Sequence, residues 1–247
     1  ARVKAVIPET TFKNGFAILN AEDDLVYEMR KGLECNVAYF SMDENNPRIK
    51  AHCATGGYAA VAENGYVTLM KVTWKCRFAK VTDIPITYGG QALHNIMNTL
   101  PAVLATYLFK DISIEDIRTA LSSFVPSASQ TPGRLNLFEF KNFKFLVDFA
   151  HNPAGLELLC DFVSKMDGEP KVGIISGTGD RRDDDIRELG RISGKFFDEI
   201  IIRQDKNLRG RTAEEIVNLR LEGIEDTKPK DNPTKKTPKQ KEANTRT

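Results

Sequence analysis

A regular alternation of short β-rich runs with amphipathic helical segments, in the second half of the chain, most constrains the fold. Strands are expected at 135–140, 143–149, 171–176 and 199–203, and helices at about 153–166, 184–197 and 212–221. Each of the last three strands is followed by a helix, the pattern of parallel strands joined by right-handed crossovers. We therefore predict an α/β fold with a small doubly wound, Rossmann-like sheet in this half.

The first half has a different pattern, with several β-rich runs before its helices. Strands are expected at 3–7, 16–19, 36–40, 59–62 and 66–71. An Asn-Gly pair within 63–65 predicts a hairpin between the last two of these. Apolar residues at helical spacing predict a largely buried helix over 92–109, with a kink or break near Leu100 because Pro101 follows. Ser113 is expected to cap a second helix.

Charge and cysteine content exclude several classes of protein. The 247 residues include 35 Lys or Arg and 34 Asp or Glu, so the net charge of +1 does not fit a strongly basic nucleic-acid binder. No apolar run approaches the ~20 residues that span a bilayer, and no secretion signal is recognisable. The four cysteines form no CxxC pair. They fit reduced thiols in the cytoplasm better than a metal site, so we expect a cytoplasmic protein with no membrane partner.

Composition also suggests where domains begin and end. Residues 125–133 are rich in Pro, Ser and Gly, and we expect domains at 1–130 and 131–225 on either side of that boundary. Residues 226–247 contain seven Lys or Arg, three Asp or Glu and no large apolar side chain, which predicts a disordered basic tail. If that tail bound nucleic acid, binding would be sensitive to salt, but it has no aromatic residues. We expect no nucleic-acid partner.

The loop after the strand at 143–149 contains Asp148, His151 and Asn152, just before the proline that begins the next helix. In open α/β sheets, ligands bind at the carboxyl ends of strands, close to helix N-termini. An Asp there can accept from sugar hydroxyls, and a His and an Asn can donate to phosphate. Alternatively, Asn152 only caps the helix and Asp148 only closes a turn.

The loops after the next two strands each contain glycine and a pair of arginines. Their candidate binding residues are Asp180, Arg181, Arg182, Arg209 and Arg211. Guanidinium groups bind oxyanions in bidentate fashion, and glycine lets the backbone come close to an anion. The alternative is a surface network of ion pairs. The carboxylates at 183–185 are expected to stabilise a helix N-terminus rather than to bind metal.

The helix at 92–109 begins with His94, Asn95 and Asn98 in its first turns. An asparagine amide can form paired hydrogen bonds with the edge of an adenine. The alternative is that these residues only cap the helix.

Taken in order, five motifs resemble the Mur ligase superfamily. They are HNIMN (94–98), TPGR (131–134), DFAHNP (148–153), SGTGDRRDDD (176–185) and NLRGR (207–211). The resemblance covers about 1–225. It implies part of the central ATPase domain of that family, followed by an incomplete C-terminal domain.

The resemblance implies an ATP-dependent amide ligase, in which ATP phosphorylates a carboxylate and an amine then attacks the acyl phosphate. The implied ATP-binding residues are His94, Asn95, Asn98, Arg134, Asp148 and Asn152. The implied catalytic residues are His151 and Arg134, beside the phosphates and the acyl phosphate. The two arginine loops would then hold the acceptor substrate. The motifs are most similar to the branch that adds L-arginine to the side-chain carboxylate of aspartate in poly-aspartate, and we expect the full enzyme to be a homo-oligomer.

One departure from the family is clear, because the chain contains no G-x-x-G-K-[ST] phosphate loop. The groups that bind the β- and γ-phosphates and Mg²⁺ would then belong to a part of the enzyme outside this sequence. We therefore expect a fragment that is inactive alone. Two alternatives remain open: a Mur-type ligase for folylpolyglutamate or peptidoglycan precursors, and a non-catalytic nucleotide-binding module.

Overall fold

The chain divides into two compact units, Ala1–Pro126 and Ser127–Thr247, as seen in a computed structural model. The structure describes residues 2–176, 179–204 and 208–227, and each unit is described here by itself. Of the expected tail at 226–247, residues 228–247 lie outside these ranges. Asp226 is described, and it is the C-cap of the helix Ala213–Glu225. Within the described ranges, no helix combines the length and the apolar character needed to cross a membrane.

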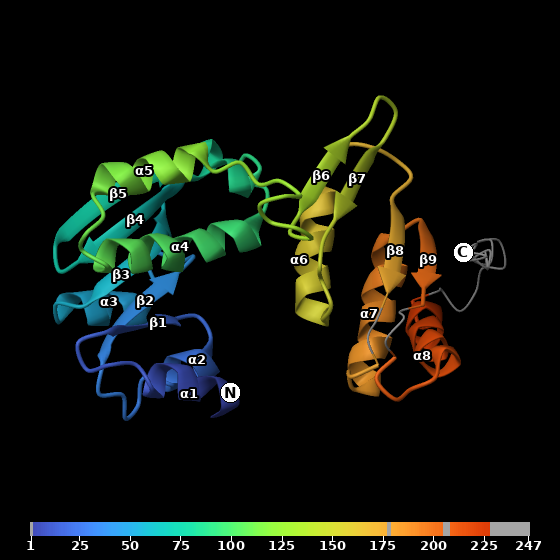
Figure 1. Ribbon diagram of the computed structural model, residues 1–247, viewed down its shortest axis with the longest axis horizontal. Coiled ribbons are helices and arrows are strands. Elements are labelled where there is room, and N and C mark those ends of the chain that lie inside the picture. The colour runs from blue at the N-terminus through green and yellow to red at the C-terminus, as the bar shows by residue number, and fades with distance from the viewer. Residues whose placement is uncertain (1, 177–178, 205–207, 228–247) are drawn as a thin grey trace. The chain divides into compact units, whose positions relative to one another are not determined.

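Unit 1 is built on a five-stranded mixed sheet (Figure 1). Its strands, which are also adjacent in this order, are β1 (Phe16–Asn20), β2 (Asn36–Ser41), β3 (Tyr58–Glu63), β4 (Tyr66–Lys71) and β5 (Trp74–Lys80). The first three run parallel, and β3, β4 and β5 form an antiparallel meander. The predicted hairpin is confirmed between β3 and β4, where Asn64 and Gly65 both have positive φ, as a tight two-residue turn requires.

Helices cover both faces of this sheet, so unit 1 has three layers. On one face lie α4 (Leu93–Leu108) and α5 (Ile114–Ser123), and on the other α2 (Asp24–Glu28) and α3 (Pro47–Ala54). Two short 3₁₀ turns, Val81–Asp83 and Pro85–Thr87, lead from β5 towards α4. The larger core places Leu100 and Leu104 of α4 on Ala60 and Leu69 of the sheet. The second core places Ile49 of α3 on Tyr39 and Val61. The sheet thus holds α4 rigidly.

Three expectations for unit 1 need correction. Residues 3–7 do not form a strand but lie in helix α1 (Arg2–Glu9), because apolar residues at 3, 6 and 7 fit helical spacing as well as a β run. The break allowed near Leu100 does not occur, because helix α4 continues through Pro101 and Leu100 and Val103 on either side of it are buried in the core. Strand β5 was not predicted from the sequence, because charged and polar residues interrupt its apolar pattern.

Unit 2 contains two separate pairs of strands. Strands β6 (Asn136–Glu139) and β7 (Lys144–Val147) are antiparallel, whereas β8 (Val172–Ser176) and β9 (Glu199–Arg203) are parallel. Its helices are α6 (Pro153–Ser164), α7 (Asp183–Phe196) and α8 (Ala213–Glu225). The parallel pair with α7 between its strands is the expected crossover unit. In the described residues β7 pairs with β6, however, and does not extend the β8–β9 sheet as the alternating pattern predicts.

Helices α7 and α8 touch backbone to backbone. A Cβ added at Gly190 of α7 would lie 2.3 Å from the carbonyl oxygen of Arg220, and one at Gly223 of α8 would lie 2.0 Å from that of Arg187. Nothing larger than glycine fits at either position. An ion pair between Arg187 and Glu222, with N and O 2.7 Å apart, also links the two helices.

Unit 2 has two small cores. In one, Leu156 and Cys160 of α6 pack on Leu189 and Ile192 of α7, and in the other Ile186 of α7 packs on α8. Burial raises the pKa of the Cys160 thiol to about 11, so this thiol is protonated at neutral pH. The outer face of the β8–β9 pair is different. Val172, Ile174 and Ile201 are exposed there, and the charged residues Glu199 and Arg203 stand at the two ends of β9.

We expect Leu100→Ala to lower the free energy of unfolding of unit 1 by about 2–5 kcal/mol, because it opens a cavity between α4 and the sheet. Leu93→Ala on the same helix is the matched control, since Leu93 is 42% exposed, and its effect should stay within about 1 kcal/mol. Urea unfolding followed by Trp74 fluorescence measures this, because the single tryptophan lies in unit 1. Equal effects of the two variants would contradict the described burial.

Candidate functional site

The candidate site residues fall into three groups, one in unit 1 and two in unit 2. The first group stands at the start of α4. Asn95 donates through Nδ2 to the carbonyl oxygen of Ile86 at 2.7 Å, which ties α4 to the preceding 3₁₀ turn and leaves Oδ1 as an acceptor. Asn98 is exposed one turn further along, and His94 is half-buried. Asn95 and Asn98, three residues apart, share a face of α4.

The second group joins the TPGR and DFAHNP segments at the start of unit 2. Asp148 accepts from the backbone N–H of Leu135 at 2.9 Å and from that of Ala150 at 2.8 Å, so each carboxylate oxygen holds a different segment. Asn136 adds a second link within the first segment, because it accepts from the Gly133 N–H and donates to the Thr131 carbonyl. Asp148 therefore has a structural role in addition to any role in binding.

Asn152 caps α6, accepting from the N–H of Gly155 at 2.8 Å, with Pro153 as the first residue of the helix. His151, just before it, is exposed, and its Nδ1 lies 2.9 Å from the carbonyl oxygen of Phe149. A carbonyl can only accept, so this contact places the proton on Nδ1 of the neutral ring and leaves Nε2 as an acceptor.

Arg134 is exposed, and its guanidinium carbon lies 5.4 Å from the centre of the Phe149 ring, a cation–π contact. The structure thus brings Arg134, Asp148, His151 and Asn152 to neighbouring positions through short-range contacts of their own segments. This group presents a cation and the N-terminus of α6, which suit an anionic ligand. The Nε2 atom of His151 is an acceptor in this tautomer, so it does not donate to phosphate as we expected from the sequence.

The third group consists of the two arginine loops, which the structure brings together. A Cβ added at Gly179 would lie 2.0 Å from the carbonyl oxygen of Leu208, so the loops touch through their backbones. Arg209 pairs with Asp180 at 2.8 Å. Arg211 pairs with Asp183 at 2.7 Å and also donates to the carbonyl oxygen of Arg181.

The arginines of this third group differ in how far their charge is already neutralised. Arg182 binds both carboxylate oxygens of Asp185, at 3.0 and 2.9 Å, and this pairing lowers the pKa of Asp185. Arg211 also pairs with Glu215. Arg181 makes no ion pair with any described residue, and its Nε is buried without a hydrogen-bond partner there. The ion-pair alternative therefore describes Arg182, Arg209 and Arg211 better than it describes Arg181.

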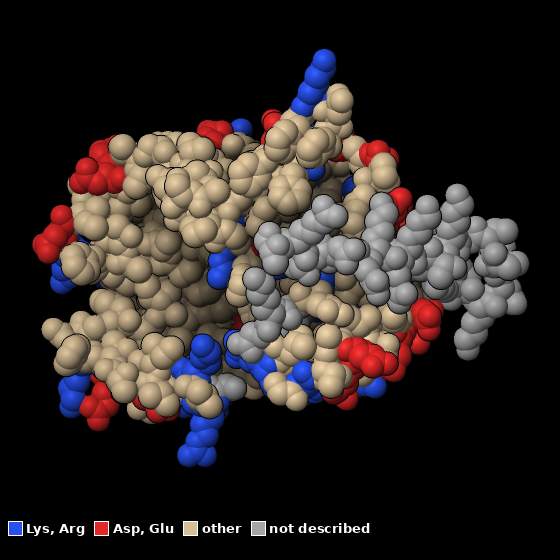
Figure 2. Space-filling model, turned by 45° about the vertical axis from the view of Figure 1, so that its right-hand side comes forward, with Lys and Arg blue, Asp and Glu red and all other residues tan. Residues whose placement is uncertain are grey.

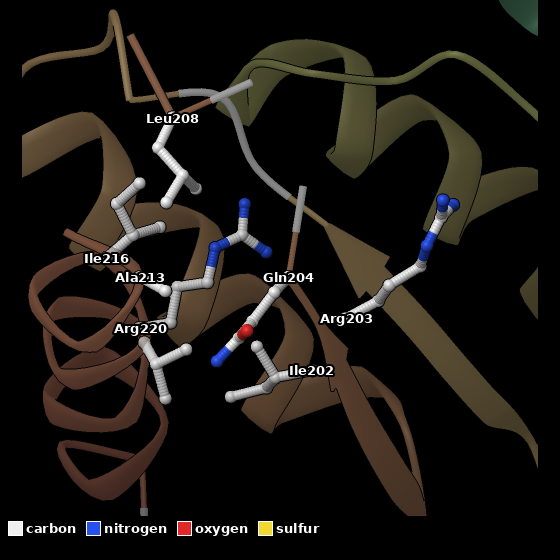
Figure 3. A pocket seen from close by; sticks show the side chains of 8 residues that line it. Ile202, Arg203, Gln204, Leu208, Ala213, Ile216 and Arg220 are labelled. Atoms are coloured by element: carbon white, nitrogen blue, oxygen red, sulfur yellow. The ribbon is translucent and has the colours of Figure 1, made fainter. Parts of the chain in front are cut away.

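Sequence reasoning missed Arg220, which lies on α8 below these loops (Figure 3). Its residue is only 2% exposed, and its Nη2 donates to the carbonyl oxygen of Ser176, the last residue of β8, at 2.6 Å. An arginine within an amphipathic helix is ordinarily a solvent-facing residue, so the sequence contains no signal of this burial. No group of three His, Cys, Asp or Glu side chains suited to a metal occurs in the part of the chain that the structure describes.

Acidic and basic side chains are interspersed on the face shown in Figure 2, where small groups of each sign are separated by wide uncharged areas.

Residues 133–242 match the family model of the Mur ligase, glutamate ligase domain, and this segment contains the second and third groups of site residues. This match places residues 133–242 in the Mur ligase family. The chain is 44% identical over 224 residues to the cyanophycin synthetase of Synechocystis sp.. That match covers 91% of this chain but only 25% of the relative, so the chain spans about a quarter of the length of the enzyme it resembles.

Solved structures show the same fold at low sequence identity. MurF from Acinetobacter baumannii matches with a TM-score of 0.62 and 20% identity, covering 91% of this chain and 44% of that one. E. coli FolC, solved in complex with DHPP and ADP, matches with a TM-score of 0.59 and 16% identity, covering 89% and 45%. These similarities establish a mixed α/β, Mur ligase-like architecture.

We expect Gly179→Ala to lower the free energy of unfolding of unit 2 by about 1–3 kcal/mol, because the new methyl group forces the two arginine loops apart. Asp167→Ala is the control, since it removes an exposed carboxylate of unit 2 that lies outside α7 and α8. Hydrogen exchange of the α7 and α8 amides measures the change. Equal protection in the two variants would show that the loops do not touch at Gly179.

Proposed function

We propose that the chain is part of an ATP-dependent ligase that adds L-arginine to the side-chain carboxylates of poly-aspartate, and that the arginine-bearing product is cyanophycin. The observation that carries this proposal is the 44% identity to a cyanophycin synthetase over 91% of the chain. The low-identity structural matches support the fold alone, so they do not distinguish this ligase from others of the family.

The proposed reaction has two steps. An oxygen of the aspartate side-chain carboxylate takes the γ-phosphoryl group of ATP and releases ADP. The α-amine of arginine then attacks the carbonyl carbon of the acyl phosphate, and the tetrahedral intermediate collapses to an amide with loss of phosphate and a proton. A carboxylate is a poor electrophile, so phosphorylation supplies the missing leaving group. Catalysis of such a transfer rests mainly on positioning and on neutralising charge.

Two groups of residues suit the nucleotide in this proposal. Asn95 and Asn98 share a face of α4, and the free Oδ1 acceptor of Asn95 fits the amino group at an adenine edge. Arg134 and the N-terminus of α6 would contact phosphate, with the Nε2 atom of His151 beside the reacting acyl group. Asp148 would contact the ribose only through lone pairs that its two backbone hydrogen bonds leave over. Mg²⁺ would neutralise phosphate charge, with most of its ligands outside this chain.

The third group suits the acidic acceptor. Arg181 is the strongest candidate for a substrate carboxylate, because Arg182, Arg209 and Arg211 already pair with carboxylates of the chain. The ion pairs of these three arginines would instead hold the two loops in place around Arg181.

Titration of ATP into the 247-residue chain tests the nucleotide part of the proposal. We expect binding without hydrolysis, because the sequence lacks a phosphate loop, and at least about tenfold weaker binding for Arg134→Ala, a loss of about 1.4 kcal/mol. Lys141→Ala, which removes an exposed cation in the β6–β7 turn, is the control. Hydrolysis by the isolated chain would show that a phosphate loop is not essential, and binding that is equal in both variants would remove Arg134 from the site.

A substrate panel on a full-length enzyme that contains this chain tests the reaction. ATP consumption that requires both arginine and poly-aspartate supports the proposal. Consumption driven by folate or by nucleotide-sugar substrates would replace it with another Mur-type activity, and nucleotide binding without any consumption would favour a non-catalytic module.

In the same enzyme, we expect Arg181→Ala to raise the KM for the acidic acceptor about tenfold, equivalent to about 1.4 kcal/mol, with little change in the KM for ATP. Arg182→Ala is the matched control, because its charge is already neutralised by Asp185, and we expect less than a threefold change. Steady-state kinetics with each substrate varied in turn measures both. A larger effect of Arg182→Ala would reverse this assignment.

A further inference from the structure

The side chain of Thr87 joins three parts of the backbone just before α4. Thr87 is the last residue of the second 3₁₀ turn and is fully buried. Its Oγ1 lies 2.6 Å from the carbonyl oxygen of Val81 and 2.8 Å from that of Ile84, so its single hydrogen is shared between them. Oγ1 also accepts from the N–H of Gly90 at 3.1 Å. One hydroxyl group thus links both 3₁₀ turns to the segment that leads into α4.

That segment has a backbone conformation that most residues avoid. Tyr88, Gly89 and Gly90 have positive φ in succession, at 52°, 67° and 85°. Glycine adopts this region freely, but tyrosine does not, so its surroundings must hold Tyr88 there. The Thr87 carbonyl contributes, because it accepts from the N–H of Gly90 at 3.1 Å and from that of Ala92 at 2.9 Å. The turn therefore closes onto the backbone and the side chain of Thr87 together.

The closed turn determines how Asn95 is presented. Nδ2 of Asn95 donates to the carbonyl oxygen of Ile86 at 2.7 Å, and Ile86 directly precedes Thr87. Ala92 is the N-cap of α4, and it has no side-chain group that could cap the helix. The start of α4 and the amide of Asn95 are therefore set by backbone that Thr87 holds. Because Nδ2 is engaged in this way, Oδ1 is the amide atom that is left for a ligand.

A second buried threonine in unit 1 shows that burial alone does not create such a network. Thr68 on β4 is as deeply buried as Thr87, and its Oγ1 has no hydrogen-bond partner among the described residues. Valine has nearly the shape of threonine but lacks the hydroxyl. At Thr68 this exchange removes an unpaired polar atom, whereas at Thr87 it removes three hydrogen-bond contacts. The two positions therefore separate the effect of these contacts from the effect of an altered core.

We propose that Thr87 is a positioning residue for nucleotide binding, because its hydroxyl holds Ile86 and the turn at 88–90 in the form that orients the amide of Asn95. Thr87 is too deeply buried to touch the nucleotide itself. The inference rests on the proposed function, in which Oδ1 of Asn95 accepts from the amino group of adenine. Guanine has a carbonyl oxygen at the corresponding position, so two acceptors would face each other. Correct orientation of Asn95 thus favours ATP over GTP.

Nuclear magnetic resonance of the ¹⁵N-labelled 247-residue chain tests the positioning step without a nucleotide. We expect Thr87→Val to shift the side-chain amide protons of Asn95 towards those of the exposed Asn142 and to speed hydrogen exchange of the Gly90 N–H about tenfold. Thr87→Ser, which keeps the hydroxyl, and Thr68→Val, the matched control, should leave both signals close to those of the unchanged chain. Unchanged Asn95 signals in Thr87→Val would overturn the proposal.

If Thr87→Val does not fold, Thr87→Cys decides. Its thiol is a weak donor and a weak acceptor at a volume close to that of serine, so Thr87→Ser becomes the reference. Asn95 signals that agree between these two variants would then contradict the positioning role.

Titration of ATP, GTP and tripolyphosphate into the same variants tests the consequence for binding. We expect Thr87→Val to weaken ATP binding about tenfold and to leave a preference for ATP over GTP below about twofold, while tripolyphosphate binding changes less than about twofold. The reason is that Asn95 reads the base, whereas other groups bind the phosphates in the proposed function. Thr87→Ser and Thr68→Val should retain the preference. Equal losses for ATP and tripolyphosphate would show a merely structural role and end the proposal.

The inference and the proposed function fail in different ways. A preference for ATP that Thr87→Val does not reduce removes the inference and leaves the proposed ligase. A full-length enzyme that ignores arginine and poly-aspartate, but prefers ATP only when the Thr87 hydroxyl is present, removes the proposed reaction and leaves the inference. A chain without any preference for ATP over GTP contradicts the role of Asn95 at the adenine and, with it, that of Thr87.

Discussion

The backbone contact between α7 and α8 is the constraint on which the rest of unit 2 depends. Glycines at 190 and 223 allow the two helix axes to come closer than any pair of side chains would permit. Each helix is preceded by one of the arginine loops, so the spacing of the helices sets the spacing of the loops. At this spacing the ion pairs Arg209–Asp180 and Arg211–Asp183 join the two loops. A stiff helix pair thus organises loops that have little packing of their own.

The sequence was a good guide wherever a pattern is local. The hairpin at Asn64, the capping box at Ser113 and the cap of α6 at Asn152 depend on neighbouring residues alone, and each forms as expected. Residues 3–7 were misassigned because a run of five residues cannot distinguish helical from extended spacing. Strand pairing in unit 2 depends on contacts between distant segments, which no local pattern encodes.

The candidate site, too, could be predicted from the sequence only in part. Arginines in loops after strands were evident from sequence, and the structure does bring the two loops together. The sequence could not predict which guanidinium groups form ion pairs within the chain. Their partners Asp180, Asp183 and Asp185 lie in one short run of acidic and basic residues, where many pairings are possible. Arg220 was missed for a related reason. Its burial follows from the packing of α8 on α7, and a helix taken alone presents it as an ordinary surface residue.

The exposed outer face of β8 and β9 has a consequence for the behaviour of the polypeptide in concentrated solution. Val172, Ile174 and Ile201 form a short apolar stripe of the kind that promotes intermolecular β-association. Glu199 and Arg203 flank Ile201 on the same side of the strand, and charges in such flanking positions act as gatekeepers against aggregation. These two charges therefore interrupt the apolar stripe on this face of the strand pair.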